Sequence, residues 1–187
     1  ERILERRQGS GTYVAQQKYN NAYIEIRNIA KDIREHYSTY HAEVVSKDTL
    51  DVQALRQPNN HWLGALFFDG NPSTNDQLYQ VCIVHYGDDL PIQYEERWVN
   101  AGVIPDFINQ DFNVINTSDY LIGHVPLEYG DYQIQAKLPP DHVRQALQMN
   151  SQEPALLHVR HTKSQGLPVT FVNMWHPGSR FSFGGTL

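Results

Sequence analysis

Apolar side chains in the first part of the chain recur at the spacing of an α-helix. Residues 24–37 carry Ile26, Ile29, Ile33 and Tyr37 at intervals of three or four positions, which predicts a helix with one apolar face. Capping residues, prolines and apolar spacing indicate further helices at 59–68, 105–110, 117–123 (with Thr117 or Ser118 as its cap) and 141–149.

Apolar runs and alternating patterns predict strands over much of the remaining chain. They fall at 41–46, 78–86, 91–99, 131–138, 155–163 and 168–175, and the sequence RFSFGG at 180–185 indicates a short last strand. Short turns at 87–90 and 164–167 join neighbouring strands, which is typical of antiparallel hairpins. The pattern therefore predicts an α+β domain in which an antiparallel sheet carries helices on one side.

The start of the chain, which includes ERRQGSGTYVA at 5–15, has a different pattern. Two short strands are expected within 3–14, around a turn at 8–11 in which glycine permits the positive φ of a tight hairpin. Residues 16–22 are polar without a period, as in a linker. The chain thus opens on a small hairpin that is separate from the larger domain.

Composition narrows the functional classes. The chain has 187 residues with 40% hydrophobic and 19% charged residues, which is ordinary for one globular domain. Its net charge of -6 argues against a basic nucleic-acid-binding face, except at the start, where Arg2, Arg6 and Arg7 gather. The single cysteine, Cys82, allows no intrachain disulfide and favours a cytoplasmic setting. No apolar run approaches the roughly 18 residues that cross a membrane.

Metal and nucleophile chemistry find little support in the residue pattern. Among the nine histidines, His158 and His161 are three apart on an expected strand, so their side chains point to opposite faces. Cys82 lies in the middle of an expected strand, where a thiol usually packs as a small apolar group. We therefore expect no metal site, no cofactor and no catalytic residues.

One row of polar residues interrupts the strand at 91–99. Gln93, Glu95 and Arg97 share one face of this strand, while the apolar Ile92, Tyr94 and Trp98 share the other, which is expected to face the core. His85 joins the polar row if the hairpin loop spans 88–90, but it points to the core if the loop spans 87–90. The row is either a binding surface or a solvated sheet face with an ion pair between Glu95 and Arg97.

Several segments resemble a known family of regulators. The sequence LERRQGSGTYVA resembles the end of the wing in winged helix-turn-helix domains of the GntR type. The chain after this segment resembles the UTRA effector domain of the HutC subfamily, and residues 48–77 depart from its pattern. The matching segments are EIRNIAKDI (25–33), LPIQYEERWVN (90–100), PDFINQDF (105–112), YLIGHVPL (120–127) and HPGSRFSFGG (176–185).

The resemblance implies three parts: a wing remnant at 1–15, a linker at 16–23 and an effector-binding domain at 24–187. It implies a chorismate-lyase-like fold with a buried pocket, a homodimer, and operator DNA bound through an N-terminal domain that this chain lacks. Arg2, Arg6 and Arg7 would belong to the wing and approach DNA. Within the subfamily the chain is most similar to repressors of histidine-utilization genes, which implies urocanate or a related imidazole carboxylate as the effector.

The resemblance also implies which residues bind the effector. Relatives that bind sugar phosphates use the positions of Ile83 and His85, where they tend to carry arginine, so a monocarboxylate that needs fewer cations fits here. Arg97 would meet the carboxylate, and Glu95 would accept from an imidazole N–H or orient Arg97. The remaining expected residues are Ile29 and Ala30 in the first helix, Ser118, His176, and Arg27 as a further charge.

A second interpretation is an enzyme with the chorismate-lyase-like fold that acts on a small carboxylate. An arginine and a glutamate in a closed pocket suit a lyase as well as a sensor. The wing-like start favours the sensor, because an enzyme acting alone has no use for a wing.

Overall fold

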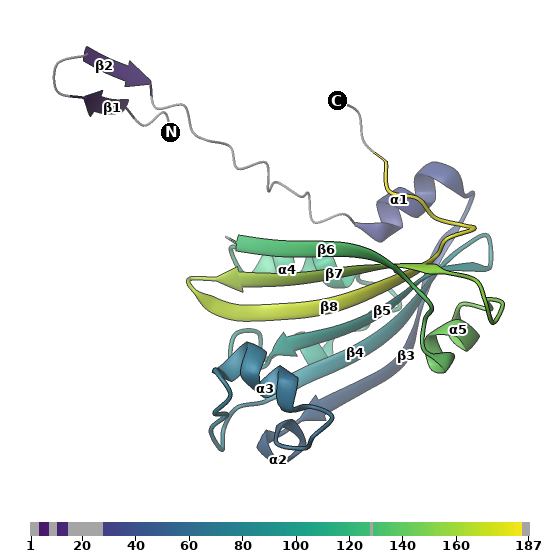
Figure 1. Ribbon diagram of the computed structural model, residues 1–187, viewed down its shortest axis with the longest axis horizontal. Coiled ribbons are helices and arrows are strands. Elements are labelled where there is room, and N and C mark those ends of the chain that lie inside the picture. The colour runs from purple at the N-terminus through teal and green to yellow at the C-terminus, as the bar shows by residue number, and fades with distance from the viewer. Residues whose placement is uncertain (1–3, 8–10, 15–27, 128, 185–187) are drawn as a thin grey trace.

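A computed structural model describes residues 4–7, 11–14, 28–127 and 129–184 (Figure 1). The small hairpin at the start consists of β1 (Leu4–Arg7) and β2 (Gly11–Val14), which pair antiparallel with Leu4 opposite Val14. The predicted pair of strands is therefore present, and Arg6 and Arg7 lie in β1. Arg2, Arg27 and the expected linker at 16–23 lie outside the described residues.

The main part of the chain is built on a six-stranded antiparallel sheet with the order β3-β4-β5-β8-β7-β6. This confirms the predicted α+β class. Strands β5 and β8, which are far apart in sequence, pair at the centre of the sheet. The strands are β3 (Tyr40–Leu50), β4 (Leu78–Gly87), β5 (Leu90–Asn100), β6 (Tyr129–Lys137), β7 (Ala155–Ser164) and β8 (Leu167–Pro177).

Helices cover both faces of this sheet, whereas the sequence analysis placed them on one. The α4 face carries α1 (Ile29–His36), the 3-10 helix η1 (Phe107–Asn109) and α4 (Thr117–His124), and the opposite α5 face carries α2 (Val52–Leu55), α3 (His61–Phe68) and α5 (Asp141–Ala146). In Figure 1, α3 and α5 lie in front of the sheet and α4 lies behind it.

The reason for two covered faces is the continuous apolar run in β4. Val81 and Ile83 pack with Tyr120 of α4, and the intervening Cys82 packs with Val143 of α5. A strand that is apolar on both faces needs a cover on each. None of the helices among the described residues is long and apolar enough to cross a membrane.

The β4–β5 hairpin turns through Asp88 and Asp89 alone, and both have positive φ (48° and 62°). The pairing that a loop at 88–90 predicted, His85 opposite Gln93, is nevertheless present, because a β-bulge at Ile92 restores it. Gly87 is required before this turn, since a Cβ there would lie 2.5 Å from the Tyr37 ring. The hairpin end is thus packed directly against the end of α1.

Two further expectations differ from the structure. The cap of α4 is Asn116, whose side chain accepts from the backbone N–H groups of Ser118 and Asp119. The sequence RFSFGG forms no strand over its described residues, 180–184. Instead, Arg180 donates to the carbonyl oxygens of Pro91, Leu147 and Gln148, which fixes the tail across the end of the sheet.

Candidate functional site

The polar row, which we define as His85, Gln93, Glu95 and Arg97, is buried under α1 and α4. These side chains belong to residues that are at most 2% exposed. The row is therefore no solvated sheet face, and the interpretation as an exposed ion pair is wrong. Tyr94 and Trp98 are buried on the opposite face, as expected of core residues.

Glu95 and Arg97 form an ion pair at the centre of the row. Nε of Arg97 donates to Oε1 of Glu95 at 2.7 Å, and the hydroxyl of Thr117 donates to the same oxygen at 2.8 Å. Burial by itself would raise the pKa of the Glu95 carboxyl, but the Arg97 guanidinium and the His85 side chain outweigh it and hold that pKa well below its usual range. Glu95 is therefore ionised at neutral pH.

The other donors of Arg97 also have partners. Nη1 lies 3.5 Å from the hydroxyl oxygen of Thr170, and Nη2 lies 3.4 Å from that of Ser118. The position of the α4 cap explains this arrangement: because Asn116 caps the helix, the hydroxyls of Thr117 and Ser118 remain available to the polar row. Arg97 is thus held by contacts to β5, β8 and α4.

His85 links the row to β3. Its Nδ1 lies 2.9 Å from the Tyr40 hydroxyl, and its Nε2 lies 3.5 Å from Oε2 of Glu95. Burial is the main reason that the pKa of Tyr40 is raised to about 12, so the phenol keeps its proton at neutral pH. Among the described residues, no three His, Cys, Asp or Glu side chains are placed to hold a metal ion.

A second buried arginine, Arg160 on β7, lies on the same face and was not found by the sequence analysis. Arg97 and Arg160 are both opposite Val172 of β8, so they stand on one line across the sheet. Nη2 of Arg160 donates to the Ser118 hydroxyl at 3.3 Å. Its Nε and Nη1 have no hydrogen-bond partner in the part of the chain that the structure describes. Burial and the nearby Arg97 lower its pKa to about 9, which leaves it charged at pH 7.

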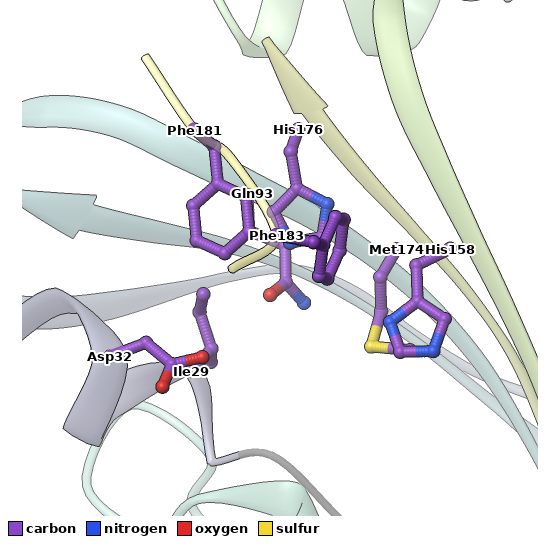
Figure 2. A pocket seen from close by; sticks show the side chains of 8 residues that line it. All are labelled: Ile29, Asp32, Gln93, His158, Met174, His176, Phe181 and Phe183. Carbon is purple, nitrogen blue, oxygen red and sulfur yellow. The ribbon is translucent and has the colours of Figure 1, made fainter. Parts of the chain in front are cut away.

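A small pocket adjoins the polar row, as Figure 2 shows. Its volume is about 10 Å³, room for about one water molecule. His176 stacks on Phe181, with ring centres 4.2 Å apart, and Phe183 meets both His158 and His176 edge-on. An organic effector therefore requires this pocket to open. The lining residues are Ile29, Asp32, Gln93, His158, Met174, His176, Phe181 and Phe183.

The expected site residues fall into two neighbouring groups. His85, Glu95, Arg97 and Ser118 are in contact in the polar row, with Ile83 opposite Glu95. Ile29 and His176 line the pocket, and Ala30 is buried beside Ile29 in α1. Gln93, which was noticed in the row but not proposed as a site residue, belongs to both groups.

A hydrogen bond connects the two helices that cover this site. Nδ2 of Asn28 donates to Oδ2 of Asp119 in α4 at 2.7 Å. Oδ1 of Asn28 accepts from the backbone N–H of Ala30 and so caps α1. The side chain of Asn28 therefore holds the start of α1 and the first turn of α4 together.

Comparison with known proteins gives the family. Residues 71–182 match the UTRA domain. The chain belongs to the UTRA domain family. It is 34% identical over 183 residues to the histidine utilization repressor of Pseudomonas aeruginosa, covering 98% of this chain and 69% of that protein. The histidine utilization repressor of Klebsiella aerogenes is 30% identical over 190 residues, covering 99% of this chain and 73% of that protein.

Solved structures agree with this assignment. The C-terminal domain of the histidine utilization repressor from Pseudomonas syringae pv. tomato is 31% identical with a TM-score of 0.69, covering 80% of this chain and 99% of that one. PhnF from Mycobacterium smegmatis, 16% identical with a TM-score of 0.68 over 98% of this chain and 77% of its own, shares the fold. The UTRA domain here is thus a regulatory effector-binding domain of a repressor, and the enzyme interpretation is not supported.

Proposed function

We propose that this UTRA domain senses urocanate, or a related imidazole carboxylate, for a repressor of histidine-utilization genes. Binding of the effector would release operator DNA, which the N-terminal domain of such a repressor holds. The names of the two relatives that are 34% and 30% identical support this choice of genes. We also propose a cytoplasmic location, because a repressor acts where its operator DNA lies.

The observation that carries the proposal is the chemistry of the pocket. Its walls are flat rings, Phe181, Phe183 and His176, which suit a flat imidazole. Nε2 of Gln93 faces the same site, is buried, and has no hydrogen-bond partner among the described residues. A buried donor without a partner is costly. An imidazole nitrogen that accepts from it would remove that cost.

The other expected residues have supporting parts in this proposal. Ile29 and His176 contact the ring, while Ala30 and Ile83 provide apolar packing beside it. Glu95 and Arg97 satisfy each other, so we assign them, with His85 and Ser118, to holding the site in shape. This is the second of the two roles considered for Glu95, that of orienting Arg97.

Titration calorimetry tests the proposal with urocanate, histidine and imidazole propionate on the whole chain. We expect saturable binding of at least one imidazole acid, weakened about tenfold in Gln93→Leu, because the variant removes one buried hydrogen bond. Gln80→Leu, an equivalent change on the α5 face of β4, is the matched control and should bind as the wild type does. Wild-type protein that binds none of the three acids would refute the proposal.

We also propose that the repressor is a homodimer. A two-fold protein matches the paired half-sites of an operator. The edge strand β6 exposes Tyr132 and Ile134, which offer an apolar contact. Light scattering at tens of micromolar should give twice the 21.6 kDa of one chain, and Ile134→Lys should lower that value. A wild-type monomer at this concentration would contradict the proposal.

A further inference from the structure

We propose that Arg160 and Thr162 on β7 form the subsite that takes the carboxylate of the effector. The inference rests on the proposed function and adds to it the residues that recognise the acid group. Both residues are buried, at 4% and 3% exposed. Among the described residues, nothing partners Nε and Nη1 of Arg160 or the hydroxyl of Thr162. Arg160 and Thr162 thus offer buried hydrogen-bond donors that have no acceptor among the described residues.

The charges of the site separate the two buried arginines. Arg97 is neutralised by Glu95 at 2.7 Å, whereas in the described part of the chain no carboxylate forms an ion pair with Arg160. Burying a charge without a counter-ion is expensive. Burial lowers the pKa of Arg160 to about 9, so its guanidinium is still protonated at pH 7. An incoming anion would supply the missing partner.

The position of Arg160 fits an acid whose ring lies in the pocket. His158, which lines the pocket, Arg160 and Thr162 alternate along one face of β7, each about 6.6 Å from the next. A ring held at His158 and Gln93 would direct a short acid chain toward Arg160. The Ser118 hydroxyl, which contacts both guanidiniums, marks the inner end of this path.

The net charge of the buried side chains predicts which class of anion the subsite prefers. The buried arginine and glutamate side chains of the site, Arg97, Arg160 and Glu95, together carry one net positive charge at neutral pH, whereas Asp32 of the pocket is not fully buried. A monocarboxylate neutralises that charge, whereas a phosphate dianion would leave a buried negative charge in excess. The subsite should therefore favour an imidazole monocarboxylate over a phosphorylated ligand.

Calorimetry with urocanate and its uncharged methyl ester tests the subsite. We expect Arg160→Met to weaken urocanate binding by about tenfold to hundredfold and to leave binding of the ester unchanged, because only the acid uses the guanidinium. Thr162→Val should weaken urocanate a few-fold. The control Arg144→Met removes the same charge from the surface of α5 and should bind both compounds as the wild type does. Urocanate binding by Arg160→Met at wild-type strength, or an equal loss of acid and ester, would overturn the inference.

Two further measurements separate failure of the subsite from other failures. If the wild type binds no imidazole acid, the proposed function is wrong, and acrylate then probes the subsite alone. Thermal stabilisation of the wild type by acrylate, absent in Arg160→Met, would still support an anion subsite, and equal behaviour would refute it. Should Arg160→Met not fold, Arg160→Gln and Thr162→Val carry the same comparison.

Discussion

Both faces of β5 are largely buried, but they differ in the chemistry of their side chains. On the α5 face, Tyr94 packs with Val143 and Leu147, and the space is filled by apolar and aromatic groups. On the α4 face, the neighbouring Glu95 and Arg97 bury opposite charges under a helix. An apolar face needs only complementary shapes, whereas a buried polar face also needs a partner for every donor and charge. The difference teaches where to look for function, because buried charges without a partner are the costliest and lie on the α4 face.

The buried donors and charges of the α4 face do not all have partners. The Glu95–Arg97 pair and its hydroxyl partners form a closed set of contacts. Arg160 and Gln93, on either side of this set, keep buried donors without partners in the described part of the chain. A buried ion pair does little for stability relative to well-packed apolar groups, but breaking one is costly. We therefore assign the Glu95–Arg97 pair to holding the site in shape, and Arg160 and Gln93 to binding the ligand.

The largest expected effect comes from breaking the pair. Arg97→Met leaves the Glu95 carboxylate buried and uncompensated, so the free energy of unfolding should fall by about 3–5 kcal/mol. Urea unfolding measures this loss. The double variant Glu95→Gln with Arg97→Met should recover most of it, since no buried charge then remains in the pair. A single variant as stable as the wild type would mean that the two faces do not differ in the way described.

The α5 face supplies the matched control for this comparison. Leu147→Ala removes packing from a fully buried side chain and should cost about 2–5 kcal/mol of unfolding free energy. Its effect on effector affinity should be negligible, because Leu147 packs in the cluster on the opposite face. A change of affinity as large as that in Gln93→Leu would show that the α5 face also contributes to effector binding.

A smaller effect is expected from pH. Burial lowers the pKa of His176 to about 3, against an ordinary 6.5, because the folded site favours the neutral ring. The unfolded chain binds the proton more readily, so this contribution is complete above pH 6.5 and is lost as the pH falls from there toward 3. Between pH 7 and pH 5 the free energy of unfolding should drop by at most about 2 kcal/mol from this residue.

His176→Asn checks the assignment of this slope, and the same change at the exposed His36 is its control. The His176 variant should flatten the curve of unfolding free energy against pH, measured in urea at half-unit steps. His161 on the α5 face, whose pKa burial also lowers, adds a slope of the same sign that both variants keep. A curve unchanged by His176→Asn would count against a buried neutral ring.

The local elements of this fold could be predicted from the sequence, and its long-range neighbours could not. Apolar runs and periodicity located the strands of the sheet and α1, and the shared face of Glu95 and Arg97 follows from alternation alone. Arg160 stands in an equally ordinary strand, and nothing local shows that β8 brings it level with Arg97. The signal that could have found it is an arginine in the middle of an expected strand, together with the hairpin register of β7 and β8.

Two local errors have physical causes of the same kind. The bulge at Ile92 depends on the packing of that side chain against Ile29 and Ile33, and no turn rule contains this contact. Asn116 caps α4, and the hydroxyls of Thr117 and Ser118 contact Glu95 and Arg97 instead of the helix end. In both cases a tertiary contact decided between locally similar choices, and in both cases the decision shaped the site.

The hydrogen bond between Asn28 and Asp119 has a mechanical consequence. Ser118, which contacts both buried guanidiniums, and Asp119, which holds Asn28, are consecutive residues of α4. If a ligand displaces the first turn of α4 at Ser118, the hydrogen bond between Asp119 and Asn28 therefore transmits this displacement to the start of α1. The first turn of α4 therefore couples the candidate site, through Ser118, to the start of α1, through Asp119 and Asn28.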